Sequence, residues 1–595
     1  MPRRGPLKLA RRLPIATIAA TLALLAGSTV PAVAASPAPT LEASPSHITF
    51  GDGVTLSGSA PDEAGCAAGR TARLEWSPSD SAVWTLRTST TTGTDGSFTF
   101  ADSPTGTGWY RIELVPSGGC PSASSDPVRV LVRARVDVSI LASGLTAGSC
   151  PSLTTIVSPP KPGQQVEVQG HSPSGWVVLD ELTLDRDSSA RARPCFGFDD
   201  LGIVRLRVRW PAQDPANATG TSPALSFRIE KAPWMRRIDR LIGGRPVSLA
   251  VGVDGTALYE RAGNVPRTPA SNEKLLLSMA LLDRLGAGHR IATIAAAASV
   301  DGGVVPGNLW ILGRGDPEIR RARMGALARR LAEAGIRRIQ GRVMGAVSYF
   351  RHDWWAEGWR PGITRRYVAP PTALTFDENR TGSGYTMSPE RLAAESLTRR
   401  LRALGIRVSG TPGAGAPPDG LTDVAEIRSR PLLTLLLRMN RPSDNFYAEV
   451  LGKLLAATSD GPPGTIAKGA GVLRSWVTSH GAAFSLHDGS GLSYANRVTA
   501  AGILHLLGVA DGTSWGRVLR GTLATGGQGT LEDRLHGERV RAKTGTLDNV
   551  SALSGWVWLE RDRAWAEFSI LSALPKWLAI RIEDGIVRTL SAHAR

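Results

Sequence analysis

A serine and a lysine three residues apart, Ser271 and Lys274, stand at the start of an almost wholly apolar segment. Residues three apart share one face of an α-helix, so the hydroxyl and the amine can meet. The apolar residues that follow predict a buried helix ending at Gly286. Burial lowers the pKa of an amine, and a neutral lysine can act as a base toward a serine. The pair predicts a serine nucleophile, although a lone SxxK also arises by chance.

The distribution of cations supports a special role for this lysine. Arginines are frequent throughout, yet no lysine occurs between Lys274 and Lys453. Arginine cannot be deprotonated in a protein, whereas lysine can. Lys274 is therefore a candidate titrating group, and the alternative is a surface lysine whose alkyl chain covers apolar neighbours.

A second polar motif, Ser443-Asp444-Asn445, follows Pro442 and precedes a helical pattern. This places it at a loop-to-helix junction, where polar side chains can face a cleft. Serine, aspartate and asparagine are also favourable N-cap residues. Taken alone, the motif is better explained by an ordinary helix cap than by a catalytic role.

A third motif, Lys543-Thr544-Gly545-Thr546, lies in RVRAKTGTLDNVSALSGWV. Its β-branched residues and the hairpin pattern after it predict an edge-like strand. Gly545 leaves room for another backbone to approach closely. A cation, hydroxyls and a bare strand edge suit an extended peptide that ends in a carboxylate.

In this order the three motifs resemble the SxxK, SxN and KTG elements of penicillin-binding proteins and serine β-lactamases. The surrounding words narrow the resemblance, which covers about residues 232–595. They are similar to the low-molecular-mass class C penicillin-binding proteins, the D-alanyl-D-alanine carboxypeptidase/endopeptidase family S13. These words are TPASNEKLL, LGRGDPEI, APPTALTFDENR, SDNFYAEVL, HDGSGLSYANRVT, GGQGTLEDRL and AKTGTLDNVSALSGWV.

The resemblance implies a role for each residue of the first two motifs. Ser271 would attack the D-Ala-D-Ala carbonyl and Lys274 would take its proton. Ser443 would relay a proton to the leaving D-alanine, and Asn445 would orient the lysine and the substrate amide. Water would then hydrolyse the serine ester. No cofactor or metal is implied.

The third motif would bind the end of the substrate. Lys543, Thr544 and Thr546 would hold the terminal carboxylate, with Gly545 between them. Backbone N–H groups of Ser271 and Thr546 would form the oxyanion hole. The partners so implied are peptidoglycan stem peptides ending in D-Ala-D-Ala and β-lactam antibiotics as covalent inhibitors.

The elements that must position these residues predict a multidomain chain. Short strands separated by turn residues predict two all-β, immunoglobulin-like modules at 35–135 and 136–230. Residues 231–595 alternate strands with long helices, which predicts an α+β catalytic domain of the penicillin-binding, serine-transpeptidase-like type, an antiparallel sheet with helices. The family places an accessory domain between the first two motifs, here expected at 293–425.

Two departures from the family concern this inserted domain. The family usually has an acidic residue before S-x-F, where this chain reads MGAVSYF with Ala346 and Val347. The stretch between Arg380 and Ala394 is also short. A reduced insert would affect the reach of the substrate and leave the chemistry in place.

Residues 1–34 predict a secretory signal peptide: a cationic start, an apolar run and the small-residue site Ala32-Val33-Ala34. A retained anchor is the alternative. The protein is expected outside the cytoplasm, as an extracellular, wall-associated or periplasmic protein. The formal net charge is +17. It is dispersed and accompanies no nucleic-acid module, so we expect no nucleic-acid partner, and an anionic cell wall is the candidate for electrostatic association.

Export permits disulfides, and the four cysteines allow three pairings. We expect Cys66 with Cys120 and Cys150 with Cys195, because each pair then falls within one β-module. Two other functions stay open. A serine β-lactamase would use the same serine and lysine with faster deacylation, and a non-catalytic wall-binding protein would work through its β-modules. The sequence also leaves open whether the bond cut is a terminal D-Ala-D-Ala bond, a peptide cross-link or both.

Overall fold

The computed structural model describes residues 37–141, 144–382 and 384–593. The predicted signal peptide lies outside this range. The chain forms two compact units. Of the described residues, the first unit holds those up to Ser139, with 154–191 and 207–224, and the second holds those of 140–153, 192–206 and from Leu225 on. Among the described residues, no helix is both long enough and apolar enough to cross a bilayer.

The first β-module consists of two sheets that share one core. Inward residues alternate along its strands: on β7, Tyr110, Ile112 and Leu114 are all fully buried. One sheet has the order β1 (Glu42–Ser44), β3 (Val54–Ser59), β6 (Ser97–Asp102). The other has the order β2 (His47–Thr49), β9 (Val128–Arg133), β7 (Gly108–Leu114), β4 (Thr71–Pro78), β5 (Thr85–Thr91), and β8 (Ala123–Ser124) pairs with β7.

The strands of the second β-module also form two sheets. The smaller has the order β10 (Arg135–Leu141), β11 (Ser152–Ser158), β14 (Ser189–Ala192). The larger has β13 (Gly175–Thr183), β12 (Gln165–Ser172), β15 (Gly202–Trp210), β16 (Gly220–Thr221), and β17 (Leu225–Ile229) beside β15. The chain is thus all-β before residue 230, as expected, while the immunoglobulin-like character of the modules stays a prediction.

Both predicted disulfides are present. Cys66 is bonded to Cys120 and Cys150 to Cys195. The first joins two loops of the first module. The second lies in the segments 140–153 and 192–206, which belong to the same compact unit as the catalytic region. Cross-links of this kind stabilise a module mainly by restricting its unfolded chain.

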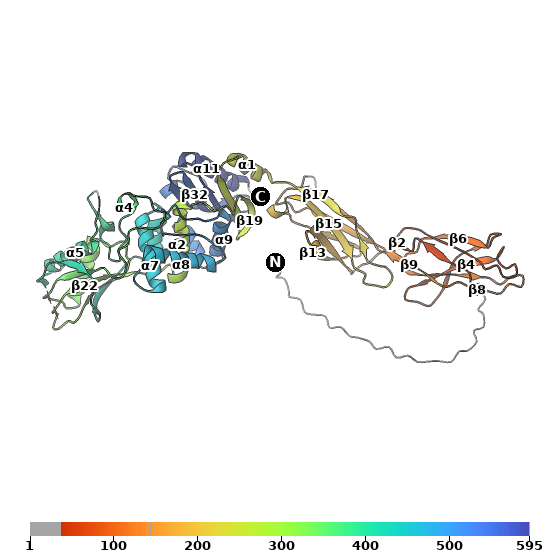
Figure 1. Ribbon diagram of the computed structural model, residues 1–595, viewed down its shortest axis with the longest axis horizontal. Helices are drawn as coiled ribbons and strands as arrows, with labels where there is room; N and C mark the ends of the chain where they lie inside the picture. Colours follow the sequence, from red (N-terminus) through yellow and green to blue (C-terminus); the bar gives the residue numbers. More distant parts are fainter. Residues whose placement is uncertain (1–36, 142–143, 383, 594–595) are drawn as a thin grey trace. The chain divides into compact units, whose positions relative to one another are not determined.

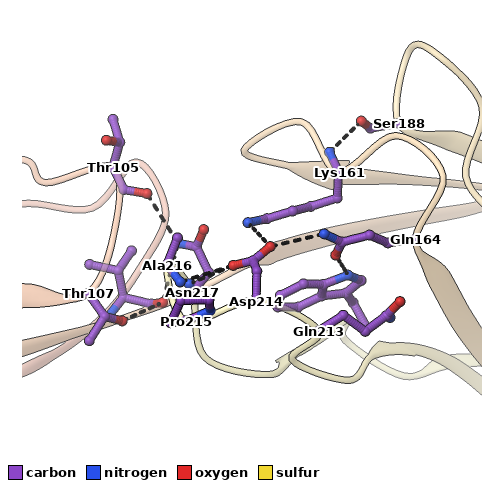
Figure 2. Close-up of polar contacts among 12 residues, drawn as sticks. Thr105, Thr107, Lys161, Gln164, Ser188, Gln213, Asp214, Pro215, Ala216 and Asn217 are labelled. Carbon is purple, nitrogen blue, oxygen red and sulfur yellow. Dashed lines mark hydrogen bonds and ion pairs between the residues drawn. The ribbon is translucent and has the colours of Figure 1, made fainter. Parts of the chain in front are cut away.

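A loop of the second module, residues 211–219, is hydrogen-bonded to the first module (Figure 2). Thr107 N donates to Ala216 O at 2.6 Å, and the Asn217 side-chain amide, 3% exposed, donates to Thr105 O at 3.1 Å. Asp214 stiffens the loop: its carboxylate accepts Ala216 N at 3.0 Å and pairs with Lys161 Nζ at 2.7 Å. These backbone and side-chain hydrogen bonds hold the loop 211–219 against the first module, because buried amides need partners within the protein.

The catalytic region is built on a six-stranded antiparallel sheet, as predicted. Its order is β19 (Thr256–Arg261), β18 (Val247–Val253), β33 (Ala564–Ser572), β32 (Val550–Leu559), β31 (Val540–Leu547), β30 (Ala524–Thr525). Alternate residues of each strand face opposite sides. On β32, Leu553 and Val557 join one apolar core, whereas Ala552 and Trp556 join the other.

Helices cover both faces of this sheet. α1 (Pro233–Ile242) and α11 (Lys576–His593) pack on one face, and α2 (Glu273–Leu285) lies in the core of the other (Figure 1). On this second side, α9 (Ala500–Asp511) and α10 (Gly516–Thr522) contact the sheet, whereas α6 (Leu432–Asn440), α7 (Asn445–Asp460) and α8 (Ile466–Ser479) pack against α2. α2 is buried nearly all round and ends at Gly286, as its sequence predicted.

The insert between α2 and α6 has its own core and a mixed sheet. The order is β28 (Gly413–Gly415), β24 (Val343–Ala346), β22 (Leu309–Gly313), β20 (Ala292–Ala297), β29 (Thr422–Arg428). Helices α3 (Arg321–Glu333) and α5 (Pro389–Ala403) pack with this sheet. A small parallel sheet of β21 (Val304–Val305), β23 (Arg338–Ile339) and β27 (Arg407–Val408) completes it. The two ends of the expected range, residues 293 and 425, fall within β20 and β29.

The base of the second module belongs to the catalytic unit. Ala147 is part of the apolar core that contains α1 and α11. The Phe198 ring packs edge-on against Tyr259 of β19, with 5.5 Å between ring centroids. The compact units therefore do not divide at residue 230, and the predicted domain limits stay a hypothesis about independent folding.

Candidate active site

The predicted nucleophile lies on a short 3-10 turn, Ala270–Asn272, that leads into α2. Ala270 has a φ of 47°, a left-handed conformation that is costly for a residue with a β-carbon. Asn272 ties the turn to the sheet, because its Nδ2 donates to Ser554 Oγ at 2.7 Å. The turn holds Ser271 at the wall of a cavity, directly above the first turn of the buried helix.

Lys274 is fully buried and has three polar partners. Its Nζ lies 2.9 Å from Ser271 Oγ, 2.8 Å from Asn445 Oδ1 and 2.6 Å from the carbonyl oxygen of Ser490. Burial lowers the pKa of Lys274 to about 8, although the nearby carboxyls of Asp488 and Glu449 oppose the shift. The structure brings serine and lysine together as the spacing predicted, and the lysine is no surface cation.

The second motif contains a helix cap and two residues of the site. Asp444 is the N-cap of α7, since its carboxylate accepts Tyr447 N at 3.1 Å. Asn445, the first residue of α7, contacts Lys274. Ser443 has a φ of 63°, and this left-handed turn directs its hydroxyl toward Lys543 at 2.8 Å. Asp444 is therefore the helix cap, whereas Ser443 and Asn445 are the candidate catalytic residues of the same tripeptide.

The third motif lies on β31, whose outer side is largely open. The short β30 pairs with Arg541 and Ala542 only. On that side of β31, none of the described strands pairs with Lys543–Leu547. Lys543 is fully buried and donates to Ser443 Oγ and to Thr544 O. Burial, with the positive charges of Lys274 and Lys576, lowers the pKa of Lys543 well below its usual value. The edge-like strand is as predicted.

Gly545 is in close contact with the turn that carries the nucleophile. A β-carbon at this position would lie 2.6 Å from the carbonyl oxygen of Pro269 and 3.1 Å from the Ala270 β-carbon. The backbone that approaches Gly545 closely is thus that of Pro269, in the protein itself, and it requires a glycine at position 545. Strand β31 and the nucleophile turn are held at a separation that no other residue permits.

For Gly545→Ala we expect acylation by penicillin to fall by about 10²-fold, because the added methyl group displaces the nucleophile turn. Overpacking should also lower the unfolding free energy by about 1–3 kcal/mol. Stopped-flow labelling and thermal unfolding measure the two effects. Gly521→Ala in α10 is the matched control, since no atom lies near its β-carbon position. Equal rates in both variants would show that the separation is not critical.

The cavity at this site has a volume of about 780 Å³. Lys274 and Lys543 lie behind its wall. Four other cations line it, but three of them are already paired with carboxylates: Arg360 with Asp548, and Arg534 and Lys576 with Glu583. The predicted site residues that line it are Ser271, Ser443, Asn445, Thr544 and Thr546, and the cations are Arg360, Arg366, Arg534 and Lys576.

A second buried lysine positions one wall of the cavity. Lys453 of α7 is fully buried and donates to the carbonyls of Arg351, Asp353 and Pro371 at 2.9–3.1 Å. These bonds hold the loop 351–371 against α7. Within that loop the Tyr367 carbonyl accepts Asn445 Nδ2 at 3.1 Å. The lysine that ended the long lysine-free stretch is thus a structural residue.

Three polar residues near Lys274 were not singled out from the sequence. Ser490 supplies the carbonyl that contacts the lysine. Asp488 accepts Gly491 N at 3.0 Å and Trp359 Nε1 at 2.7 Å, and Glu449 accepts Ser490 N at 2.8 Å. A signal was present in the word HDGSGLS, where an acid among glycines indicates a tight turn with backbone N–H groups to satisfy. Among the described residues, no group of three or more His, Cys, Asp or Glu side chains is arranged to hold a metal ion.

The sequence and the fold match known proteins. The sequence model of the D-Ala-D-Ala carboxypeptidase 3 (S13) family matches residues 247–388 and 385–592, more than half of the chain. A D-alanyl-D-alanine carboxypeptidase of an Actinomadura species is 29% identical over 405 residues, covering 52% of this chain and 75% of that protein. A carboxypeptidase of Mycobacterium tuberculosis is 30% identical over 334 residues, covering 51% and 70%.

Among solved structures, penicillin binding protein 4 of Haemophilus influenzae has a TM-score of 0.54 at 20% identity. The match covers 61% of this chain and all of that protein. At this identity the likeness establishes the fold. The family match establishes that the chain belongs to the D-Ala-D-Ala carboxypeptidase S13 family of serine peptidases, as its motifs indicated.

Proposed function

We propose that this protein hydrolyses the D-alanyl-D-alanine bond at the end of peptidoglycan stem peptides through an ester on Ser271. The observation that carries the proposal is the contact between Ser271 Oγ and a fully buried Lys274 Nζ at 2.9 Å. A pKa near 8 leaves a sizeable fraction of this amine neutral at physiological pH. The family membership supports the same bond as substrate.

The partners of Lys274 favour its action as a base. A neutral amine has two N–H groups and one lone pair. Asn445 Oδ1 and the Ser490 carbonyl can only accept, so they take the two N–H groups and leave the lone pair facing Ser271. The Ser271 proton passes to this lone pair as Oγ bonds to the carbonyl carbon of the penultimate D-alanine.

The leaving group and the substrate carboxylate are served by the other two motifs. Ser443, held by Lys543, relays the proton that Lys274 took from Ser271 to the nitrogen of the departing D-alanine as the peptide C–N bond breaks. Thr544 and Thr546 line the cavity, and their hydroxyls bind the terminal carboxylate. The peptide extends along the open edge of β31. Water then hydrolyses the ester and frees Ser271.

Penicillins acylate the same serine in this proposal, and peptide cross-links are cut as well as terminal bonds where they fit the cavity. We place the enzyme outside the cytoplasm. The predicted leader and the two disulfides support this location, since disulfides persist in oxidising compartments. The net positive charge supports electrostatic association with an anionic wall.

The test is incubation of the purified protein with a fluorescent penicillin and, separately, with pentapeptide muropeptides. We expect one stable covalent label per molecule and release of D-alanine. Rapid turnover of the penicillin with no release of D-alanine would establish a β-lactamase instead. Absence of both label and release would favour a non-catalytic wall-binding protein.

A further inference from the structure

Glu449 is a buried carboxyl that the proposed reaction does not use directly, yet it lies next to the base. It is 1% exposed and belongs to α7, one helical turn beyond Asn445. Residues four apart lie on the same helix face. One face of α7 therefore presents both the amide that contacts Lys274 and this carboxyl.

The carboxyl binds the turn that supplies another partner of the lysine. Glu449 Oε1 accepts Gly489 N at 3.1 Å and Ser490 N at 2.8 Å. The carbonyl of the same Ser490 accepts Lys274 Nζ at 2.6 Å. The N–H of the Gly489–Ser490 peptide is thereby fixed, and with it the orientation of the carbonyl that follows.

The turn has little freedom to find another arrangement. A β-carbon at Gly489 would lie 2.9 Å from the Ala448 carbonyl of α7, and one at Gly491 would lie 2.0 Å from the Ala270 carbonyl. The turn is thus packed between α7 and the residue before the nucleophile. The turn cannot shift toward another acceptor, so loss of the Glu449 carboxyl would remove the buried acceptor of two backbone N–H groups.

We propose that Glu449 is a positioning residue of the reaction, which aims the Ser490 carbonyl at Lys274 so that the lysine's lone pair faces Ser271. The proposal rests on the proposed function, because it assigns Glu449 a task only if Lys274 is the base. Of the three atoms around Lys274 Nζ, α7 controls two: Asn445 Oδ1 directly and the Ser490 carbonyl through Glu449.

The negative charge of Glu449 has a second, measurable effect. The charged groups around Lys274 are Glu273 on its own helix, Asp444 and Glu449 of α7, Asp488 in the 487–492 turn and Lys543 on β31. Glu449 raises the pKa of Lys274, and burial together with Asp488 raises the pKa of Glu449 itself. A neutral residue here should therefore lower the pKa of the lysine.

Two variants separate position from charge. Glu449→Gln keeps an oxygen that accepts both N–H groups, and Glu449→Ala does not. For Glu449→Ala we expect the second-order rate constant of penicillin acylation to fall by about 10²-fold per folded molecule. For Glu449→Gln we expect a rate at alkaline pH within a few-fold of wild type, and an acid limb moved to lower pH.

The control is Glu390→Gln, another buried carboxyl, which contacts His352 in the inserted domain. It should lower stability and leave the acid limb in place. If Glu449→Ala acylates like wild type, or if Glu449→Gln leaves the acid limb unmoved, the proposal is wrong. Should Glu449→Ala not fold, the acid limb of Glu449→Gln decides alone. A wild-type protein that takes no label would instead overturn the proposed function.

Discussion

Replacing Ser271 by alanine should abolish covalent labelling by penicillin and lower the release of D-alanine by roughly 10⁴-fold or more, because no other group takes over a missing nucleophile. The hydroxyl lies at the cavity wall and makes one contact, with Lys274 Nζ at 2.9 Å. Its removal should leave the fold intact. Mass spectrometry of peptides from the labelled wild type should locate the adduct on Ser271.

The matched control is Ser278→Ala on the same helix. Ser278 is fully buried, donates to the Lys274 carbonyl at 2.7 Å and accepts Asn440 Nδ2 at 3.0 Å. Its loss should cost about 1–2 kcal/mol of unfolding free energy and leave labelling intact. An adduct on another serine, or undiminished labelling of Ser271→Ala, would remove Ser271 from the proposal.

Much of the catalytic fold could be predicted, because its elements are long and strongly patterned. The apolar run after Lys274 predicted α2 and its end at Gly286, and the hairpin pattern after the KTG motif predicted the β32–β33 hairpin. These patterns reflect burial on one face or on all faces, which local sequence records directly. The disulfides followed from sequence order once two modules were recognised.

The insert was harder to predict in detail. Several of its strands have only two to five residues, and its main sheet mixes parallel and antiparallel pairs. Strands so short carry no clear periodicity, and their pairing depends on contacts distant in sequence. The packing of Ala147 and Phe198 with the catalytic region was not predicted either, because it also depends on contacts distant in sequence. A domain boundary read from composition shifts does not record such contacts.

In the site, the sequence predicted the catalytic side chains but not the backbone carbonyl that contacts Lys274. Three motifs brought Ser271, Lys274, Ser443 and Asn445 together as predicted. The Ser490 carbonyl was not predicted, since every residue has a carbonyl and only the turn decides where it points. Lys543 was expected to hold the substrate carboxylate, and the structure places it behind the cavity wall, against Ser443. Burial of a lysine is decided by the tertiary fold.

The second large effect concerns Lys274→Arg, for which we expect acylation to fall by about 10²–10⁴-fold. Arginine keeps a positive charge but has no accessible neutral form, so it cannot take the Ser271 proton. Lys274→Met, which buries no charge, tests the same loss without an added cation. Stopped-flow measurement of penicillin labelling gives the rate for each variant.

The pH dependence of the acylation rate tests whether Lys274 acts as a neutral base. Burial lowers the pKa of Lys274 to about 8, and only the neutral amine is a base. In the wild type the acylation rate should rise with pH up to about 8 and then level, because deprotonation supplies the active form. Both Lys274 variants should lack this rise. Lys453→Met, which removes the fully buried lysine of α7, should lower stability and keep the rise. An unchanged rise in Lys274→Arg would assign the titration to another group, and Lys274 would no longer be the base.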